Sequence, residues 1–419
     1  MSLVEKEINQ RNVELTNSNP GFAHRRERES KLIGTSPAVF DRYKPLAVPI
    51  EQTYLSNPEE EFSLRVRCEY TPEGNLYTAT LKDMGEVIDG ARERLEIDTP
   101  ISVDAYNFYA QNDQYPTLKK MRTTVAQGVT IDFVEGFEVP IVEIETNDPI
   151  LRAGAMVLFG PDDVRDRTGD RSLDSESLAH ALSGVERTST AETLDVFSSR
   201  VAQEMVAEYV SGRKQVVVGL TGMSGSGKTT VTNAIRDSIT QNFGNEYEPA
   251  VVSTDDYHRG KRWLEETYGA PWTEWDDPRV YNTEELAHDL AALENGQPLL
   301  KRHFDFETEE TAFDEALPPS PFIIVEGLYA GSSDLKKVRH LHFALPTGIA
   351  TSVGRDVRRL VIENRANRAF PTPESRLKYQ IESALPQFLK QEKPEAHRFS
   401  ASVRPLADRA FMLARLSEL

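Results

Sequence analysis

The chain has 419 residues, with 67 aspartates and glutamates against 48 lysines and arginines, so its formal net charge is −19. This balance argues against nonspecific binding to nucleic acid or anionic membranes, and the length suits two or three domains of about 150 residues. Cys68 is the only cysteine, which excludes an internal disulfide framework and a cysteine-based zinc site. No apolar run approaches the roughly 18 residues of a membrane span, and no apolar signal-peptide core follows the first residues. We expect a soluble cytoplasmic protein with neither nucleic acid nor a membrane as partner.

The N-terminal third has the pattern of an antiparallel β structure. Residues 1–22 are polar and are expected to form a mobile arm. From about residue 23 to 150, short alternating segments are separated by turn residues such as those at 72–74. Charged residues recur at spacing two in these segments, with apolar residues such as Val66 and Ile144 between them. Because residues two apart share a face of a strand, one face is packed and the other carries both signs of charge.

This charged face has two interpretations. An antiparallel sheet with one solvated face is common and needs no function. If the sheet closes instead, the charges face one another. Lysines and arginines would then hold a polyphosphate, and carboxylates would hold Mg²⁺ or Mn²⁺, which prefer oxygen ligands.

The order of these segments resembles the CYTH superfamily, the triphosphate tunnel metalloenzymes. The segment Glu27-Arg-Glu29-Ser-Lys31 matches the E-x-E-x-K signature of that family, and the resemblance extends over residues 23–183. It implies an α+β domain built around a closed eight-stranded antiparallel tunnel. The implied metal ligands are Glu27, Glu29, Asp132, Glu143 and Glu145. The implied phosphate-binding residues are Lys31, Arg65, Arg67, Lys82, Lys120 and Arg122.

One residue departs from the family pattern, and the activity stays open. Arg94 stands where the pattern has a carboxylate, which leaves the register of its strand undecided. Members of the family hydrolyse inorganic triphosphate, thiamine triphosphate or nucleoside triphosphates, and some cyclise ATP. The alternatives for this domain are therefore a metal-dependent triphosphatase, a non-catalytic polyphosphate or nucleotide sensor, and an adenylyl cyclase.

The C-terminal half has the pattern of a parallel sheet flanked by helices. A linker is expected at 184–196, followed by a second domain at 197–419. Apolar runs at 215–220, 250–253, 322–326 and 340–345 alternate with segments of helical spacing. Strands that alternate with helices predict an α/β fold with a parallel sheet.

The stretch from Gly222 to Thr229 fits G-x-x-x-x-G-K-[ST], the phosphate-binding loop, between an expected strand and an expected helix. Glycines let backbone N–H groups approach phosphate oxygens, and the helix N-terminus favours negative charge. We expect Lys228 to reach the β- and γ-phosphates of ATP and Thr229 to hold Mg²⁺. The predicted ATP-binding residues are Gly222, Ser224, Gly225, Ser226, Gly227, Lys228, Thr229 and Thr230.

Two carboxylates and an arginine-rich segment suggest phosphoryl transfer. Asp255 follows a strand and could accept a proton from a substrate hydroxyl. Glu326 ends another strand and could orient Mg²⁺. Arginines from Arg355 to Arg368 could form a lid. The alternatives are a helix N-cap for Asp255, a turn residue for Glu326 and a solvated helix face for the arginines.

Residues 214–412 resemble the uridine kinase/phosphoribulokinase family of P-loop kinases. The shared motifs are the phosphate loop, Ser-Thr-Asp-Asp-Tyr-His at 253–258, Trp-Asp-Asp-Pro at 275–278, Arg-His-Phe-Asp-Phe at 302–306, Ile-Val-Glu-Gly at 324–327 and Leu-Ala-Asp at 406–408. The resemblance implies Asp255 as general base, Asp276 against ribose hydroxyls and Phe304 in a base pocket. We expect Arg365 in the lid to act in catalysis.

The acceptor of this kinase is not fixed by the resemblance. Uridine kinases carry a histidine that reads the base after a Tyr-Asp-Phe motif. In this chain the corresponding segment at 302–306 is followed by Glu307, Thr308 and Glu309 instead. The sequence therefore predicts a bifunctional protein that acts on small-molecule phosphates and nucleotides with ATP and Mg²⁺. A nucleotide-hydrolysing switch without an acceptor is the alternative for this half. The oligomeric state stays open, with a homo-oligomer as one alternative because related kinases often assemble.

Overall fold

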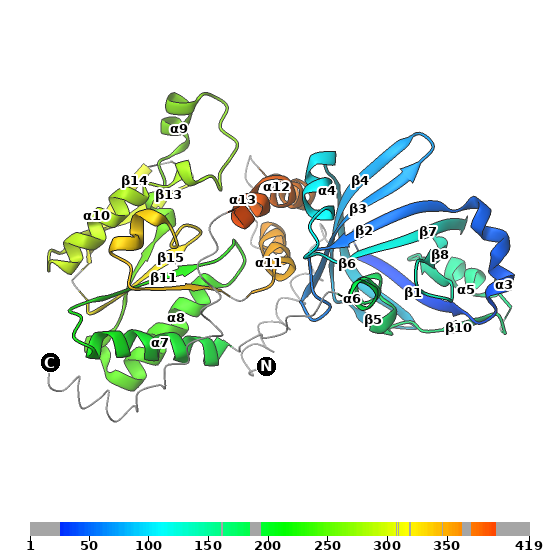
Figure 1. Cartoon of the computed structure of the whole chain (residues 1–419), viewed down its shortest axis with the longest axis horizontal. Coiled ribbons are helices and arrows are strands. Elements are labelled where there is room, and N and C mark those ends of the chain that lie inside the picture. Colours follow the sequence, from blue (N-terminus) through cyan, green and yellow to red (C-terminus); the bar gives the residue numbers. More distant parts are fainter. Residues whose placement is uncertain are drawn as a thin grey trace. The chain divides into compact units, whose positions relative to one another are not determined.

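A computed structural model describes residues 26–160, 162–184, 194–306, 308, 310–317, 320–345, 347–362 and 370–390. The chain forms two compact units, drawn in Figure 1. The first comprises Met1–Ser189 with Gly348–Glu382, and the second comprises Thr190–Thr347 with Ser383–Leu419. Within the described ranges, no helix combines the length and the apolar character that a membrane crossing requires.

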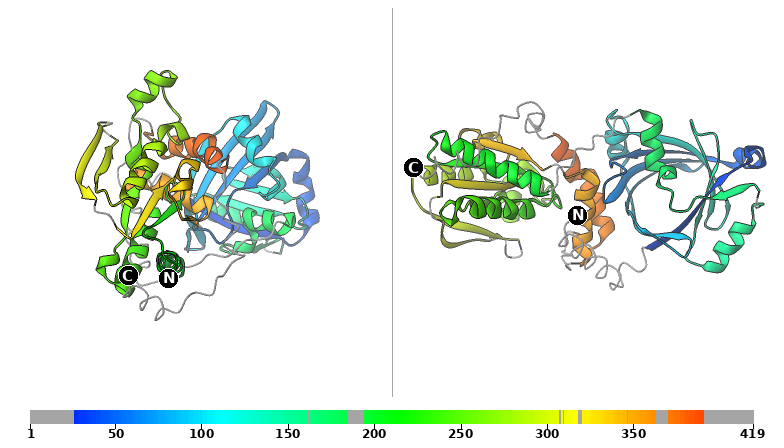
Figure 2. Two further views of the ribbon diagram at one scale, coloured as in Figure 1. Left: turned by 60° about the vertical axis from the view of Figure 1, so that its left-hand side comes forward. Right: turned by 90° about the horizontal axis from the view of Figure 1, so that it is seen from below.

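The first unit is a closed antiparallel barrel of eight strands. They are β1 (Arg26–Gly34), β2 (Val48–Tyr54), β3 (Phe62–Thr71), β4 (Gly74–Asp83), β6 (Ala91–Pro100), β7 (Thr117–Ala126), β8 (Val129–Val134) and β9 (Ile141–Glu145). The spatial order is β1-β9-β8-β7-β2-β3-β4-β6, and β6 pairs back onto β1, which closes the ring. Figure 2 shows these strands curving around a common axis. The predicted closed tunnel is confirmed.

Shorter elements surround the barrel. Two short strands pair at its edges, β5 (Glu86–Ile88) and β10 (Val164–Asp166). The helices of this part are α3 (Pro37–Phe40), η1 (Asp41–Leu46), α4 (Val103–Ala110), α5 (Pro149–Val157), η2 (Arg171–Leu173) and α6 (Ser175–Ser183). Leu32, Ile131, Val142 and Ile144 are fully buried between the strands and α5, so the apolar positions of the alternating pattern form the core.

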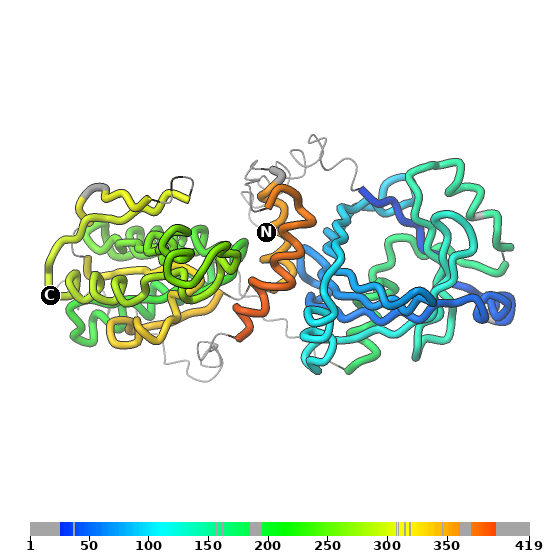
Figure 3. The backbone as a smooth tube through the Cα atoms, turned by 90° about the horizontal axis from the view of Figure 1, so that it is seen from above, coloured from blue at the N-terminus to red at the C-terminus, as the bar shows by residue number. Residues whose placement is uncertain are grey.

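A segment that the sequence analysis assigned to the second domain packs with the barrel. It contains α11 (Ile349–Ile362) and α12 (Pro373–Tyr379), and runs into a π-helical turn, η7 (Gln380–Ala384). Helix α11 packs on β3 and β4, and α12 packs on β6. Figure 3 draws this segment as an orange tube. The amide of Thr351 donates to the carboxylate of Glu60 over 2.9 Å, and Tyr109 Oη donates to the carbonyl of Ile381 over 2.8 Å.

The second unit has the parallel sheet that the sequence predicts. Its strands are β12 (Ala250–Ser253), β15 (Phe322–Gly327), β11 (Val216–Thr221) and β16 (Leu341–Ala344), all parallel and in that spatial order. A separate antiparallel hairpin follows, made of β13 (Leu299–Asp305) and β14 (Glu310–Leu317). The helical elements are α7 (Leu194–Val210), α8 (Lys228–Phe243), η3 (Asn245–Tyr247), η4 (Thr254–Tyr257), α9 (Lys261–Tyr268), η5 (Pro278–Val280), α10 (Thr283–Glu294), η6 (Ser333–Lys337) and α13 (Leu385–Lys390).

Helices cover both faces of this sheet, so its strands are apolar throughout. On one face, α7 and α8 pack on β11, β15 and β16, with Met205, Ile235 and Phe322 fully buried. On the other face, Leu286 and Leu290 of α10 pack on β15 and β12. A parallel sheet covered on both faces leaves its carboxyl-end edge as the place where ligands bind.

Candidate functional site

The phosphate loop leaves β11 and enters α8 at the carboxyl-end edge of the sheet. Gly225 and Gly227 have φ angles of 78° and 88°, which suit glycine and turn the backbone amides of the loop inward. Lys228 Nζ donates to the carbonyl oxygens of Gly222 and Met223 at 3.0 and 3.1 Å, so its ammonium lies over the loop. Among the described residues, Ser226 Oγ is buried without a hydrogen-bond partner. The loop thus presents unsatisfied donors, as a phosphate site requires.

Two carboxylates face this loop from neighbouring strands. Ser253, the last residue of β12, lies opposite Glu326 of β15 in register, and Asp255 follows within the turn η4. Burial raises the pKa of Asp255, opposed by the nearby Lys228 ammonium. Burial also raises the pKa of Glu326, opposed by Lys228 and reinforced by Asp255. The structure therefore brings Lys228, Asp255 and Glu326 together at one edge.

Two of the local alternatives for these residues are settled by geometry. The cap of the η4 turn is Ser253, whose hydroxyl accepts from the amide of Asp255 at 3.2 Å, so Asp255 does not cap a helix. Glu326 lies within β15 and is not a turn residue. Its Oε2 is buried without a hydrogen-bond partner among the described residues.

The donors at this edge fit a magnesium ion. Thr229 is exposed in the first turn of α8, and the orphaned Glu326 Oε2 is a hard oxygen donor. Mg²⁺ keeps several waters and usually binds one or two protein groups together with substrate phosphates. No cluster of three or more histidine, cysteine or acidic side chains suited to a metal occurs in the described part of the chain.

One of the predicted acceptor residues, Phe304, packs against a histidine. Phe304 of β13 is buried, and its ring stacks on His258 with centroids 4.6 Å apart. Trp275, next to Asp276, stacks on the other side at 6.1 Å, and Phe306 approaches edge-on at 5.5 Å. His258 Nδ1 accepts from the amide of Gly260, and burial lowers the pKa of the ring to about 4, so it is neutral. Sequence reasoning gave His258 no role, although it ends the Ser-Thr-Asp-Asp-Tyr-His motif.

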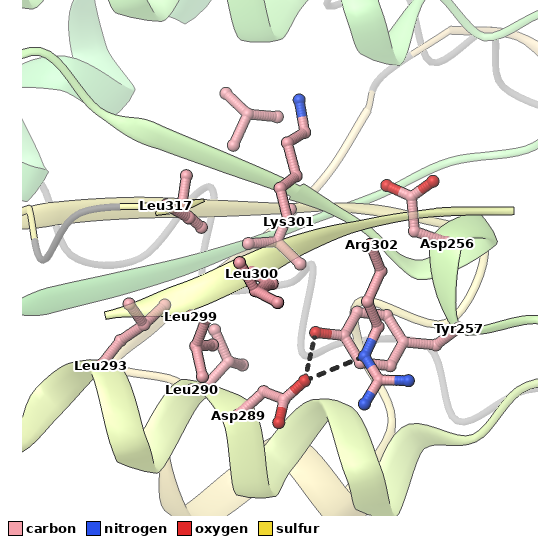
Figure 4. Close-up of a pocket in the computed structure, with 12 residues that line it drawn as sticks. Asp256, Tyr257, Asp289, Leu290, Leu293, Leu299, Leu300, Lys301, Arg302 and Leu317 are labelled. Atoms are coloured by element: carbon pink, nitrogen blue, oxygen red, sulfur yellow. Dashed lines mark hydrogen bonds and ion pairs between the residues drawn. The ribbon is translucent and has the colours of Figure 1, made fainter. Parts of the chain in front are cut away.

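A pocket beside Asp256 lies between the hairpin and α10 (Figure 4). Tyr257 Oη donates to Asp289 Oδ2 over 2.9 Å, and Arg302 Nε donates to the same oxygen over 3.2 Å. Leucines such as Leu293 and Leu299 form the rest of the lining. Arg302 of the Arg-His-Phe-Asp-Phe motif therefore anchors β13 to α10 and holds Phe304 in place.

The arginine-rich segment lies partly outside the described residues. Arg365 and Arg368 fall there, so their predicted role in the lid stays a prediction. Arg355 of α11 forms a bidentate ion pair with Glu61 of the barrel unit, with Nε 3.0 Å from Oε2. Burial lowers the pKa of Arg358, opposed by nearby Asp83.

The barrel interior contains a pocket lined by both signs of charge. The lining residues include Lys31, Arg65, Lys82, Arg92, Arg94, Arg122, Glu143, Glu145, Asp174 and Glu176. All but the last two come from strands at spacing two. The inward charges predicted for a closed sheet are therefore confirmed as neighbours, and the solvated-face alternative does not apply to them.

Ion pairs connect these charges across strands. Lys31 Nζ lies 3.2 Å from Glu29 Oε1 and 3.8 Å from Glu143 Oε1. Lys82 Nζ lies 2.9 Å from Glu27 Oε2. Arg122 is also paired with Glu143. The interior is a network of ion pairs. A chain of phosphates could displace the carboxylates from these pairs and bind to the cations.

Asp132 is saturated by two cations. Its two oxygens lie 2.6 Å from Nε and a terminal nitrogen of Arg122, and Lys120 Nζ lies 2.6 Å from Oδ2. Burial lowers the pKa of Lys120 to about 8, and Arg122 acts in the same direction. Arg67, by contrast, pairs with Glu69 and does not line the pocket.

Helix α6 supplies two lining residues that sequence reasoning missed. Asp174 precedes the helix and lies 3.1 Å from Lys31 Nζ and 2.7 Å from Arg92. Glu176, in its first turn, is hydrogen-bonded by Ser56, and burial raises its pKa to about 7. The sequence analysis names no functional residue between Glu145 and the linker at 184–196. A sequence signal for this part of the pocket was Arg92, the partner of Asp174, because it continues the spacing of two before Arg94.

The first-strand carboxylates do not fit a metal ion in this structure. Glu27 and Glu29 are both engaged by the tunnel's own cations, and Asp132 is saturated. The predicted roles of Glu27, Glu29, Asp132, Glu143 and Glu145 as metal ligands stay predictions.

Comparisons with known proteins agree with both halves. Residues 217–351 match the Phosphoribulokinase / Uridine kinase family, so the C-terminal part of the chain carries a domain of that family. A uridine kinase of Staphylococcus epidermidis is 35% identical over 121 residues, which cover 27% of this chain and 53% of that protein. The aligned stretch thus spans about half the length of that relative.

The N-terminal region matches triphosphatases of the CYTH type. The inorganic pyrophosphatase TTM2 of Arabidopsis thaliana is 29% identical over 150 residues, which cover 34% of this chain and 20% of that protein. The solved structure of the inorganic triphosphatase NE1496 covers 36% of this chain and 93% of its own, with 22% identity and a TM-score of 0.24.

Proposed function

We propose that this chain is a bifunctional enzyme with two separate phosphate sites. One is an ATP-dependent kinase centre that phosphorylates a hydroxyl of a small molecule. The other is a tunnel that hydrolyses a linear triphosphate. The observations that carry the proposal are the glycine-rich loop under the Lys228 ammonium in one unit and the buried cations that line the barrel interior in the other.

In the kinase centre, Asp255 takes the proton of the acceptor hydroxyl as the hydroxyl oxygen attacks the γ-phosphorus of ATP. The bond from that phosphorus to the β–γ bridging oxygen breaks, and ADP leaves. Burial supports this role because it raises the pKa of the carboxyl towards that of a working base. Lys228 and the loop amides bind the phosphates and stabilise the charge of the transferring group. Thr229 and Glu326 would hold Mg²⁺, which when bound neutralises phosphate oxygens.

In the tunnel, Lys31, Arg65, Lys82 and Arg122 bind the oxygens of the triphosphate and hold it along the barrel axis. Their burial strengthens these contacts because the surrounding medium screens charge weakly. The phosphate chain replaces protein carboxylates as the partner of these cations. Water then attacks the terminal phosphorus and the bond from that phosphorus to its bridging oxygen breaks, so that pyrophosphate leaves, orthophosphate forms and a proton goes to solvent.

The test separates the two sites by substitution. Phosphate release from tripolyphosphate and ATP-dependent phosphorylation of nucleosides and other small hydroxyl compounds are measured for Lys228→Ala and Arg122→Gln. Arg213→Gln and Arg28→Gln are matched controls, because both arginines pair on the outside of their units. We expect Lys228→Ala to lose phosphorylation by about a hundredfold or more and to keep tripolyphosphate hydrolysis, and Arg122→Gln to do the reverse. Loss of both activities in Lys228→Ala would mean that a single site does both reactions.

A second candidate is a tunnel that senses a polyphosphate and regulates the kinase. The observation that favours it is the position of α11, which follows kinase strand β16 in sequence but packs on barrel strands β3 and β4. This function predicts that tripolyphosphate binds without being hydrolysed and changes the kinase rate. The same assay with tripolyphosphate added to the phosphorylation reaction distinguishes the two.

A further inference from the structure

The guanidinium of Arg94 lies between the two carboxylates of the first strand. In the β1–β6 pairing, Arg94 stands directly opposite Glu27, and Arg92 stands opposite Glu29. Arg94 Nε lies 3.3 Å from Glu27 Oε2, and a terminal nitrogen bonds Glu29 Oε2. The side chain also lines the tunnel pocket. The register that the sequence left undecided therefore turns Arg94 inward.

Each of these carboxylates is paired with two cations. Glu27 is shared by Arg94 and Lys82, and Glu29 is shared by Arg94 and Lys31. Lys82 is also shared with Glu96, and Lys31 with Glu143 and Asp174. The ion pairs of Arg94, by contrast, join it to Glu27 and Glu29. A guanidinium does not lose its proton at any ordinary pH, so Arg94 keeps its positive charge between the two carboxylates. A divalent cation placed between Glu27 and Glu29 would meet this fixed positive charge in a medium that screens poorly.

The neighbouring carboxylate on the other side of β1 differs. Glu145 stands opposite Glu29 in the β1–β9 pairing. Among the described residues no cation lies within ion-pair distance of its carboxylate, and burial raises its pKa. Glu145 therefore differs from Glu27 and Glu29, each of which is paired with Arg94 and a lysine.

We propose that Arg94 is a built-in cation that takes the place of a metal ion between Glu27 and Glu29, and that this pair holds Arg94 as a phosphate-binding residue. The inference rests on the proposed triphosphate site and deepens it. The ligand class is a linear polyphosphate whose binding does not require a metal at the first strand. Glu27 and Glu29 act as positioning residues for the guanidinium.

The test measures metal and phosphate binding separately on the full chain. Mn²⁺ alone is titrated by electron paramagnetic resonance, and tripolyphosphate is titrated calorimetrically in the presence of EDTA. The variants are Glu27→Gln and Arg94→Gln. Arg28→Gln is the matched control, since Arg28 lies on the same strand and pairs with Glu93 on the outer face.

We expect wild type to bind tripolyphosphate in EDTA, and Arg94→Gln to weaken that binding tenfold or more. Mn²⁺ affinity should change less than twofold in Glu27→Gln. A tenfold loss of Mn²⁺ affinity in Glu27→Gln would overturn the inference, because the carboxylate would then be a metal ligand. Unchanged metal-free tripolyphosphate binding in Arg94→Gln would overturn it as well.

A conservative variant guards against misfolding, and the outcomes separate the two proposals. Arg94→Lys keeps the charge, so it should retain at least part of the metal-free binding that Arg94→Gln loses, and equal losses in both would count against the inference. If wild type binds tripolyphosphate only with Mn²⁺, and Glu27→Gln abolishes this, the triphosphate site stands and the inference is wrong. If wild type binds tripolyphosphate under no condition, the proposed tunnel function itself fails.

Discussion

Replacing Asp132 by alanine should destabilise the barrel because it leaves a fully buried ammonium without its partner. Asp132 is 1% exposed and Lys120 is 3% exposed, and 2.6 Å separates Lys120 Nζ from Oδ2. Breaking a buried pair by removing one member typically costs about 3–5 kcal/mol. Arg122 keeps Glu143 as a partner, so most of the cost falls on Lys120.

The size of this effect has a ceiling set by proton release. Without Asp132, Lys120 can escape its unpaired charge by losing its proton. At pH 7 that step costs about 1.4 kcal/mol for each unit below the ordinary lysine pKa of 10.5, or about 5 kcal/mol in all. The ceiling falls to about 2 kcal/mol at pH 9, because fewer pH units then separate the solution from the ordinary lysine pKa. A lysine whose folded pKa is depressed gains stability as pH rises towards its unfolded pKa, so the variant should recover towards wild type at high pH.

Calorimetric melting of the full chain at pH 7 and pH 9 checks this. A loss of about 3–5 kcal/mol lowers the melting temperature of a domain of this size by about 6–20 °C. The double variant Asp132→Leu/Lys120→Met removes both charges and should lie closer to wild type than Asp132→Ala. A loss below about 1 kcal/mol at pH 7, or an equal loss at pH 9, would refute the argument that Lys120 depends on this carboxylate.

Three further substitutions or treatments test other parts of the structure. Burial raises the pKa of Glu176 to about 7, with Glu60 and Asp174 acting in the same direction, so wild type should lose stability between about pH 4.5 and 7. Glu176→Gln should remove that loss, which is worth at most roughly 3 kcal/mol. A pH profile of chemical denaturation that is unchanged in the variant would contradict this. Gly354→Leu should weaken the packing of α11, because a Cβ at this position overlaps the ring of buried Phe62. Limited proteolysis should therefore cut α11 faster in this variant than in the control Ser352→Ala. Equal rates would show that α11 does not need this close approach. The thiol of Cys68 is 1% exposed and its pKa is raised by burial, so a thiol reagent should react only after unfolding, and rapid labelling of the native chain would mean that β3 opens locally.

The fold could be predicted well wherever the pattern was local. The alternation of Val66 with Arg65 and Arg67 gave the strand β3, and the apolar run before Gly222 gave β11. Closure of the barrel depends on the pairing of β1 with β6, residues about 65 positions apart, as in Glu29 with Arg92. No local pattern encodes that pairing, so the tunnel came from the resemblance rather than from periodicity.

The parts of the site that escaped prediction depend on distant neighbours. Arg94 looked like a departure because its reason is Glu27 and Glu29 on another strand. Glu176 lay in a segment without alternation, since α6 presents it from a helix. Residues 348–382 follow a kinase strand, and sequence order alone could not show that Glu60 and Glu61 would hold α11 by the amide of Thr351 and the side chain of Arg355.

The direction of each carboxyl pKa distinguishes two kinds of acidic residue in these sites. Burial alone raises the pKa of every one, because water no longer solvates the charge. The pKa is nevertheless lowered at Glu27 and Glu143, where the effect of adjacent cations outweighs that of burial. It stays raised at Asp255 and Glu326, where Lys228 is the opposing cation. The kinase centre therefore lacks positive charge that a nucleotide-bound cation would supply, whereas the first strand of the tunnel already has its own in Arg94, Lys82 and Lys31. On this physical ground the two proposed phosphate sites differ in what they need from solution.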